Sequence, residues 1–436
     1  MQFNFFKNTV FPITIGIVLV LISCANIGKK NHQSDKIIFD YEREILKPAE
    51  DDISIIVGAN QIETYLPLLK GKRIGIVANQ TSVIFKGTGQ SINPNKPNYK
   101  GKSEIGFTHL VDSLLSLQLN IKKVFAPEHG FRGMADAGEH VNDGFDKKTN
   151  LPIASLHGKY RKPTQALLED LDMVVFDIQD VGVRFYTYIS TLHYVMEACA
   201  EAKIPVLILD RPNPNGHYID GPTMEIEHKN FLGMHPIPLV HGMTIGEYAK
   251  MINGEEWLTD GLQCNITVIP IENYTHKTCY SLPIRPSPNL PNDKSIELYP
   301  SLGLFEGTNI NAGRGTEFQF QRYGAPFLNK DVMNFTYTPV SNFGAKNPKH
   351  KDRLCYGEDL SNETVDGMTL KWVIKAYQNS NDKSKFFNTD NFTKHAGTPK
   401  LQKQIEQGFS EAQIRESWQQ DLYNFKITRK KYLIYD

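Results

Sequence analysis

The sequence predicts an α/β fold with a largely parallel sheet, followed by a smaller α+β domain. Short β-branched runs alternate with helical patterns through the first half of the chain. Four of these runs have the composition of buried strands: 73–78, 122–126, 173–178 and 205–209. Between them, 107–119 and 187–202 carry apolar residues at the 3.6-residue period of a helix. Alternation of this kind favours a parallel sheet with helices on both faces.

After residue 211 the pattern changes to that of the smaller α+β domain. Residues 212–216 and 286–292 are dense in turn formers, and 266–271 is one isolated strand with alternating hydrophobicity. Helices are expected over 371–377 and 400–418, and the polar segment 346–352 is expected to be a surface loop. The second domain should begin between Gly261 and Ser281, so we divide the folded chain into residues 53–270 and 271–436.

Composition agrees with a folded, two-domain chain. The 436 residues include 48 basic and 48 acidic ones, with 22% charged and 40% hydrophobic residues. These values exclude a disordered chain, and the length favours two domains. Zero net charge without a long basic tract argues against nucleic acid as the main partner.

The first residues have the pattern of an export signal. The apolar run 10–22 is shorter than the roughly 20 residues that a membrane span needs, and it ends in Ser23-Cys24, which resembles the lipobox of bacterial lipoproteins. We expect a signal peptide over 1–24, a lipid anchor on Cys24 and a polar tether over 25–52. The alternatives are an uncleaved short anchor and a plain signal peptide with a chance cysteine. No acidic residue follows Cys24 directly, which favours the periplasmic side of the outer membrane.

Polar residues follow each of the four strands of the first half. In an open parallel sheet, ligands bind beyond the carboxyl ends of the strands, where the loops converge. Ordinary solvated turns would favour Lys, Glu and Ser, with little aromatic content. These exits instead carry the following residues, in chain order: Asn79 and Gln80; Glu128, His129 and Arg132; Asp180, Arg184 and Tyr186; and Arg211.

Glu128 is the leading candidate for catalysis. It follows a buried strand directly, between Pro127 and Phe131, and these neighbours are expected to desolvate the carboxyl and raise its pKa. Such a group can donate a proton at neutral pH. The alternative is a salt bridge to Arg132 or Arg184, which would lower the pKa.

Two neighbours of Glu128 have open roles in the sequence. His129 either orients Glu128 or points away from it. Asp180 and Arg184 either form a structural pair or bind substrate.

A second group of polar residues lies in the C-terminal half. Glu306 and Asn309 precede Arg314, whose flanking glycines permit backbone approach to a ligand. The guanidinium of Arg314 can bind a carboxylate with two hydrogen bonds. A glycine turn made only for tight packing is the alternative. If the two domains face each other across a cleft, Glu306 supplies a second carboxylate opposite Glu128.

Familiar cofactor and metal motifs are missing from the sequence. No G-x-G-x-x-G follows the first strand, and there is no Walker A motif, no G-x-S-x-G and no H-E-x-x-H. The histidines lack metal-ligand spacing, so we expect neither a cofactor nor a metal. Of the cysteines after Cys24, Cys199 has a helical apolar setting typical of a buried thiol. A bridge between Cys264 and Cys279 is a minor alternative.

Taken together, the motifs resemble those of the exo-acting β-N-acetylmuramidases of peptidoglycan recycling, from about Glu63 to the C-terminus. The matching segments are 73–81, 125–133 with its Pro-Glu-His-Gly motif, 175–188, 209–214, 241–244, 286–291, 305–309 and 313–316. The resemblance implies a Rossmann-like domain joined to a smaller domain, with the site in the cleft between them. It also implies release of N-acetylmuramic acid from the non-reducing end of glycan fragments, with Glu128 as the leading catalytic residue. Val183 departs from the family pattern, in which a small residue precedes this arginine.

Glycoside hydrolysis needs a proton donor and a second group that activates water or attacks the sugar. The second group stays open among Asp180, Glu306 and the N-acetyl group of the substrate. Arg314, Arg184 or Arg211 is expected to bind the lactyl carboxylate of muramic acid. The remaining candidates for substrate binding are Asn79, Gln80, His129, Arg132, Tyr186 and Asn309. The competing interpretations are a glycan-binding lipoprotein without catalysis and a different hydrolase, such as an amidase or esterase.

Overall fold

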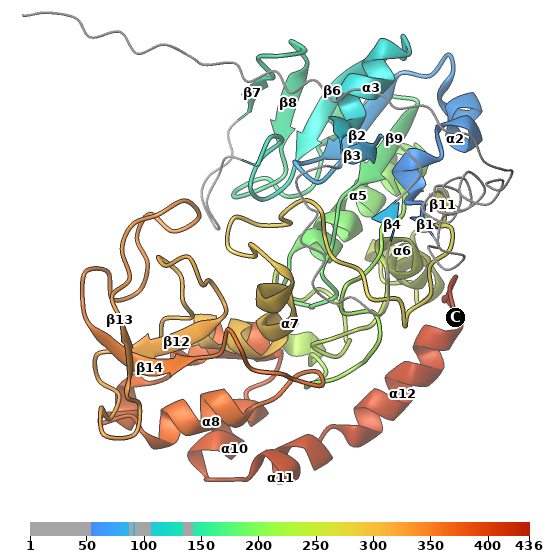
Figure 1. Cartoon of the computed structure of the whole chain (residues 1–436). Coiled ribbons are helices and arrows are strands. Elements are labelled where there is room, and N and C mark those ends of the chain that lie inside the picture. The colour runs from blue at the N-terminus through green and yellow to red at the C-terminus, as the bar shows by residue number, and fades with distance from the viewer. Residues whose placement is uncertain (1–53, 87–89, 92–105, 134–142) are drawn as a thin grey trace, which may run out of the picture. The chain divides into compact units, whose positions relative to one another are not determined.

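Seven strands form the central sheet of the computed structural model, which describes residues 54–86, 90–91, 106–133 and 143–436 (Figure 1). Their order is β11-β10-β9-β2-β6-β8-β7, and all neighbours are parallel except β7 and β8. The bounds are β2 Ile74–Ala78, β6 Ile121–Ala126, β7 Gly144–Phe145, β8 Pro152–Ser155, β9 Met173–Asp177, β10 Val206–Leu209 and β11 Ile266–Ile269. The predicted signal peptide, Cys24 and the tether lie outside the described residues.

The central strands of this sheet contribute to a core on each face, because successive side chains of a strand point to opposite sides. Ile74 and Ile76 of β2 pack with helices α2 (Ile62–Leu69) and α3 (Leu110–Ser116). Val77 of the same strand belongs to the other core, together with α5 (Tyr188–Ala202) and α6 (Ile245–Gly254). A strand buried on both faces is hydrophobic throughout, which is why these segments were visible in the sequence.

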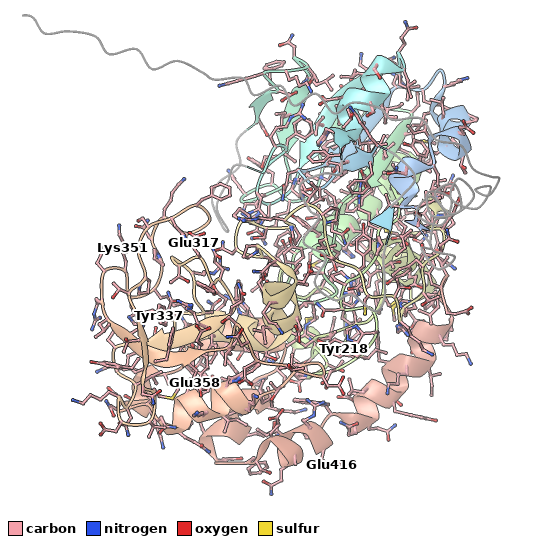
Figure 2. All side chains as sticks on the ribbon, viewed as in Figure 1. Tyr218, Glu317, Tyr337, Lys351, Glu358 and Glu416 are labelled. Atoms are coloured by element: carbon pink, nitrogen blue, oxygen red, sulfur yellow. The ribbon has the colours of Figure 1, made fainter. Side chains whose placement is uncertain are left out.

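The C-terminal half contains a three-stranded antiparallel sheet and six further α-helices. The sheet order is β12-β14-β13, with β12 Arg322–Ala325, β13 Phe335–Tyr337 and β14 Cys355–Asp359. Glu358 of β14 accepts a hydrogen bond from Lys375 of α8 at 2.5 Å, which ties the sheet to that helix (Figure 2). The helices are α7 Asp293–Leu302, α8 Lys371–Gln378, α9 Thr389–Ala396, α10 Lys400–Glu406, α11 Glu411–Glu416 and α12 Gln419–Lys430.

Short elements complete the described chain. Two strand pairs lie outside the main sheets: β1 (Ser54–Ile55) with β4 (Gln90–Ser91), and β3 (Val83–Phe85) with β5 (Phe107–His109). A four-residue helix, α4, covers Gln165–Leu168. The 3-10 helices are η1 Gly58–Asn60, η2 Ile226–His228, η3 Thr259–Gly261, η4 Gly303–Gly307 and η5 Lys383–Lys385.

The α/β class, the four buried strands and the 187–202 helix are confirmed, and three local predictions are corrected. The segment 266–271 is no isolated strand, because β11 pairs in parallel with β10 and extends the central sheet. The predicted helix 107–119 begins as strand β5, and α3 starts only after His109 caps it. The predicted helix 400–418 is interrupted at Gly408, and Ser410 caps the N-terminus of α11.

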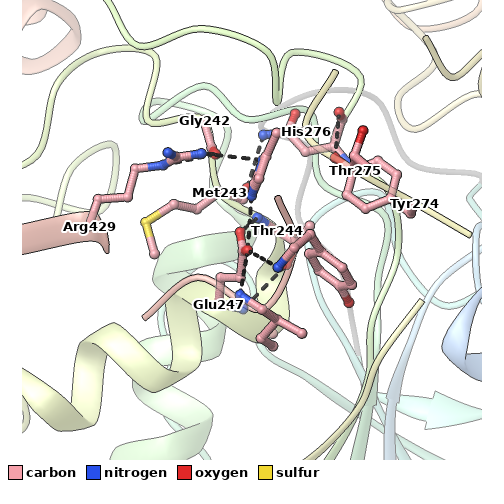
Figure 3. A network of polar contacts seen from close by, with 12 residues as sticks. Gly242, Met243, Thr244, Glu247, Tyr274, Thr275, His276 and Arg429 are labelled. Carbon is pink, nitrogen blue, oxygen red and sulfur yellow. Dashed lines mark hydrogen bonds and ion pairs between the residues drawn. The ribbon is translucent and has the colours of Figure 1, made fainter. Parts of the chain in front are cut away.

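The last residues of the chain bind the first half of the fold. Glu247, in the first turn of α6, accepts hydrogen bonds from His276 Nε2 at 2.9 Å and from the backbone N–H of Ile434 at 2.9 Å (Figure 3). Tyr435 donates its hydroxyl to Asp210 Oδ2 at 2.6 Å. One hydrophobic core runs from Ile55 to Tyr435, and residues 52–436 form one compact unit. The two predicted halves therefore share a core.

The described cysteines are all free thiols. Cys199, Cys264 and Cys355 are buried and Cys279 is exposed, so the buried thiol at Cys199 is confirmed and the minor alternative of a Cys264–Cys279 bridge is not realised. Within the described ranges, no helix combines the length and the apolar character needed to cross a bilayer.

Candidate active site

The predicted convergence of strand exits occurs at the topological switch point of the sheet. β2 lies between β6 and β9, so the chain builds outward on one side of β2 and then continues on the other. Asn79, after β2, donates its amide to the Tyr188 hydroxyl at 2.8 Å. Gln179, after β9, donates its backbone N–H to Thr81 Oγ1 at 3.0 Å. The exits of β2 and β9 are thereby joined.

Glu128 sits at the exit of β6 in a strained turn. His129 has φ 70° and Gly130 has φ 75°, and a histidine in this left-handed region costs about 1 kcal/mol or more. The Glu128 side chain is partly buried, and Thr187 Oγ1 donates to Glu128 Oε2 at 2.8 Å. Because Thr187 directly precedes α5, the carboxyl lies at the positive N-terminal end of that helix. The strain and the placement support a functional role for this turn.

An aromatic cluster connects this turn with the C-terminal half. Tyr186 contacts Tyr188 edge to face, with ring centroids 4.9 Å apart, and Tyr299 of α7 at 6.0 Å. Burial raises the pKa of Tyr299. Arg314 lowers it, whereas the charges of Glu306, Glu128 and Asp180 raise it further. All three candidate carboxylates therefore lie within electrostatic range of one tyrosine.

Glu306 and Arg314 form an ion pair in the C-terminal half. Arg314 Nε donates to Glu306 Oε1 at 3.0 Å, and the side chains are 21% and 25% exposed. Burial raises the pKa of Glu306, but Arg314 and Lys349 outweigh it and hold the pKa at about 2. Glu306 is thus ionised at neutral pH. Among the described residues, the two terminal nitrogens of Arg314 have no hydrogen-bond partner, which leaves them available for an anionic ligand.

The glycines beside Arg314 are required by packing. Gly313 has φ 77° and Gly315 has φ 79°. A Cβ on Gly313 would lie 2.4 Å from the Phe318 carbonyl oxygen, and one on Gly315 would lie 2.6 Å from the Val340 carbonyl oxygen. This supports the packing alternative for the turn, and it also explains how Arg314 is held beside Glu306.

Asp180 lies deeper, and it is not paired with Arg184. Its Oδ2 accepts the backbone N–H of Gly182 at 2.7 Å, whereas Oδ1 has no partner and the residue is 4% exposed. Burial raises its pKa to about 7. His241 Nε2 lies 3.8 Å from Oδ2 and is itself without a partner. Because His241 Nδ1 accepts the Met243 N–H, Nε2 carries the proton of the neutral ring.

Three of the predicted arginines have structural partners. Arg184 is 0% exposed and donates to the carbonyl oxygens of Pro222, Ile237, His395 and Ala396 at 2.6–3.1 Å. Arg211 is 3% exposed and forms a two-bond ion pair with Asp177. Arg132 pairs with Asp112 and Asp146. Neither Arg132 nor Arg184 forms the alternative salt bridge to Glu128, and direct substrate binding by Arg184 or Arg211 does not fit their burial.

The remaining predicted binding residues are placed at the same exits or in the C-terminal half. Asn79 and His129 are buried, and Tyr186 donates to the Pro286 carbonyl oxygen at 2.7 Å. Gln80 Nε2 donates to the same oxygen at 3.1 Å. Asn309 is exposed, and its amide donates to the Lys385 carbonyl oxygen at 2.5 Å.

Three residues of the candidate site were not among the site residues predicted from the sequence. Thr187 is a neutral residue at the start of the predicted helix 187–202, Tyr299 lies in no predicted element, and Lys349 lies in the segment predicted as a surface loop. A potential metal-ligand group in the described part of the chain is Glu225, Glu227 and His228, away from these residues in the chain. Glu225 Oε1 lies 2.6 Å from Lys400 Nζ, so one carboxylate of this group is already paired with a cation.

Comparisons with known proteins agree with this architecture. Residues 74–294 match the family model "Exo-beta-N-acetylmuramidase NamZ, N-terminal", and 297–435 match its C-terminal counterpart. The Peptidoglycan beta-N-acetylmuramidase NamZ of Bacillus subtilis (strain 168) is 39% identical over 397 residues, which cover 86% of this chain and 90% of that protein.

Two crystal structures of DUF1343 family proteins from Bacteroides fragilis NCTC 9343 share the fold. One is 45% identical with a TM-score of 0.76, and covers 88% of this chain and 99% of that chain. The other is 27% identical with a TM-score of 0.70, and covers 88% and 100%.

The two family models and the 39% identical relative define the class of this chain, which is a glycoside hydrolase. The chain belongs to the exo-β-N-acetylmuramidase NamZ family.

Proposed function

We propose that this protein releases N-acetylmuramic acid from the non-reducing end of peptidoglycan fragments, with Glu128 as general acid and base between the two halves of the fold. The observation that carries the proposal is the position of Glu128. It lies at the switch point and accepts a hydrogen bond from Thr187. Its charge raises the pKa of Arg314 in the C-terminal half. The relative from Bacillus subtilis is a peptidoglycan beta-N-acetylmuramidase, which supports the same substrate class.

The chemistry assigns different tasks to the carboxyl groups. Glu128 gives its proton to the glycosidic oxygen as the bond from that oxygen to the anomeric carbon breaks. The oxygen of a water molecule then bonds to the anomeric carbon, and the proton lost by that water restores the acid. The second carboxylate is Glu306 in this proposal, and its negative charge stabilises the positive charge that develops at the anomeric carbon before water bonds there. Glu306 is ionised and partly exposed, whereas Asp180 is buried with a pKa of about 7.

Arg314 supplies the specificity in this proposal. The lactyl ether of muramic acid carries a carboxylate that glucosamine lacks, and a guanidinium binds carboxylates with two parallel hydrogen bonds. Arg314 uses Nε for Glu306 and keeps its terminal nitrogens for such a group. The site therefore favours muramic acid over its parent sugar.

The test uses 4-nitrophenyl β-N-acetylmuraminide and the matching glucosaminide. Release of 4-nitrophenol from the muraminide alone is expected, and Arg314→Met should reduce that preference. Release from neither compound, with binding of a muramic-acid disaccharide retained by wild type and Glu128→Gln alike, would instead indicate a glycan-binding protein.

The acid role of Glu128 has a sharper test. Glu128→Gln should lower kcat on a muramic-acid–glucosamine disaccharide by about 10²–10⁴-fold. The loss should be smaller on the 4-nitrophenyl compound, because its leaving group needs less protonation. Thr187→Ser, which keeps the hydroxyl on Glu128, is the matched control. Equal losses on both substrates would contradict proton donation by Glu128.

We also propose that the chain is exported and anchored by a lipid on Cys24, on the periplasmic side of the outer membrane. The apolar run before Ser23-Cys24 supports this. Cys24→Ala should lose incorporation of labelled palmitate and move from the membrane to the soluble fraction, whereas Cys279→Ala should not. Unchanged labelling in Cys24→Ala would contradict the anchor.

A further inference from the structure

The ammonium group of Lys349 is enclosed by backbone carbonyl oxygens of the segment that carries Glu306. Lys349 Nζ donates to the carbonyl oxygens of Phe305 at 2.8 Å, Glu306 at 3.2 Å and Thr308 at 2.7 Å, with that of Ile310 at 3.4 Å. These residues belong to η4 and the turn after it. One cation therefore holds the backbone before, at and after Glu306.

The carbonyl groups of this turn need such a partner. The last carbonyls of a helical turn have no partner inside the helix and carry partial negative charge. Lys349 satisfies them at a position where it is itself partly buried. Burial lowers the pKa of Lys349, and the nearby charge of Glu306 raises it. Without these hydrogen bonds, burying the charged ammonium group would cost free energy.

Neighbouring contacts fix the same turn from its other sides. His350 Nε2 donates to the Asn309 carbonyl oxygen at 2.6 Å, and Asn391 of α9 donates its amide to the Glu306 carbonyl oxygen at 3.3 Å. Asn311 Nδ2 donates to the Lys349 carbonyl oxygen at 2.9 Å, which returns the lysine backbone to the turn that carries Arg314. Lys349 and its neighbours thus form hydrogen bonds to the backbone on both sides of the Glu306–Arg314 pair.

We propose that Lys349 is a positioning residue for the muramidase reaction: its ammonium sets the backbone of 305–310 so that Glu306 and Arg314 face the substrate. This inference rests on the function proposed above. It assigns to Lys349 no contact with the substrate. Besides the charge that helps to keep Glu306 ionised, its contribution is geometric. A displacement of about 1 Å at a reacting group can cost about 10²-fold in rate.

Two variants and two additives test the inference on the chromogenic muraminide. Lys349→Met keeps the aliphatic volume and removes the ammonium, and we expect kcat/KM to fall by about 10²-fold. Lys349→Ala leaves space beside the carbonyl oxygens that bind the ammonium group, so added methylammonium should restore much of the activity of this variant. Tetramethylammonium at the same ionic strength should not, because it has no N–H to donate. Methylammonium should not rescue Lys349→Met, whose side chain fills the site.

Lys351→Met is the matched control. Lys351 is an exposed lysine two positions along the chain, at the edge of the C-terminal half (Figure 2). It should keep wild-type kcat and KM, with and without methylammonium. Thermal unfolding of each variant reports whether the chain is folded during the assay.

The outcomes separate this inference from the proposed function. An inactive wild type would contradict the proposed function itself. An active wild type with an equally active Lys349→Met would overturn only the role of Lys349. Equal rescue by both ammonium salts would also overturn it. Should both neutral variants fail to fold, Lys349→Arg decides: its guanidinium keeps the charge but does not fit a cage made for a compact ammonium. Reduced kcat/KM in folded Lys349→Arg supports the inference, and wild-type activity overturns it.

Discussion

Burial decides which charged residues at the strand exits are free to meet a ligand. Arg184 and Asp180 follow the same strand, yet Arg184 is held by four backbone carbonyl oxygens and Asp180 is enclosed beside His241. A buried guanidinium must find acceptors inside the protein, because it has lost those of water. Arg314, in contrast, is partly exposed and uses only one of its nitrogens for Glu306. Charge alone therefore could not distinguish a binding arginine from a structural one.

Asp180 should make stability depend on pH in the opposite sense to an ordinary paired carboxylate. Burial raises its pKa to about 7, and the unfolded value is about 3.9, so the folded protein binds more protons between these values. This contribution is complete below about pH 4 and is lost as the pH rises toward 7, by at most about 1.4 kcal/mol per pH unit.

Asp180→Asn cannot ionise, so its free energy of unfolding should rise relative to wild type from about pH 4 to about pH 7 and then level off. Urea unfolding at a series of pH values measures this. Asp331→Asn, at an exposed position, should follow the wild-type curve. A constant difference between Asp180→Asn and wild type would show that Asp180 is ionised throughout.

At the scale of elements, short turns position the site more than long helices do. Glu128 lies in a turn with two consecutive residues at positive φ, and Arg314 lies between two glycines at positive φ. Turns of this kind have few alternative conformations once packed, and they hold a side chain at the end of a strand or helix. The helix α5 contributes through its first residues, where Thr187 meets Glu128.

Gly313→Ala tests the turn that carries Arg314. The alanine would pay the cost of positive φ, about 1–2 kcal/mol, and its Cβ would also meet the Phe318 carbonyl oxygen at 2.4 Å. Gly71→Ala is the matched control, because Gly71 has φ 73° with nothing within 4 Å of the added Cβ. Gly71→Ala should lose stability only, measured by urea unfolding, and keep kcat/KM. Gly313→Ala should lose more stability and also kcat/KM; equal effects of the two variants would contradict the packing argument.

At the scale of the whole molecule, the two halves are joined by a continuous core and by the end of the chain. α12 leads back to the first half (Figure 1). There the Tyr435 hydroxyl donates a hydrogen bond to Asp210, and the backbone N–H of Ile434 donates one to Glu247. Arg184 adds a second link, because its carbonyl partners come from residues 222 and 237 and from α9. Such a shared core favours cooperative unfolding of both halves.

Tyr435→Phe should weaken this link. The variant removes the hydroxyl between Asp210 Oδ2 and the Ile271 N–H, both buried, at an expected cost of about 1–3 kcal/mol. Tyr423→Phe on α12 changes an exposed hydroxyl and should leave stability unchanged. Far-UV circular dichroism and fluorescence should give one coincident urea transition for wild type. Separate transitions for the two probes would contradict a common core.

The parts of the fold that were predictable are those decided by local pattern. The strands β2, β6, β9 and β10 consist mostly of buried apolar residues because helices cover both faces, and α5 carries a complete apolar period. The polar exceptions are Lys122 and Lys123 of β6 and Asp177 at the end of β9. The prediction of an isolated strand at 266–271 is wrong because β11 pairs with β10, some sixty residues earlier in the chain. Pairing over that distance produces no pattern in the local sequence. Helices α6 and α11 begin with capping boxes, a local signal that the hydrophobic period does not contain.

By itself the sequence determined the class of fold, the family through its ordered motifs, and the exits at which Glu128 and Asn79 would lie, because strand order and hydrophobic period are local properties of the chain. Only the tertiary structure decided which charges are enclosed and which are open. It buried Arg184 and Arg211, paired Glu306 with Arg314, and turned Lys349 onto the carbonyl groups beside Glu306. The reason is that solvation and charge pairing depend on residues brought together from distant parts of the chain, and no pattern along the sequence encodes those distances.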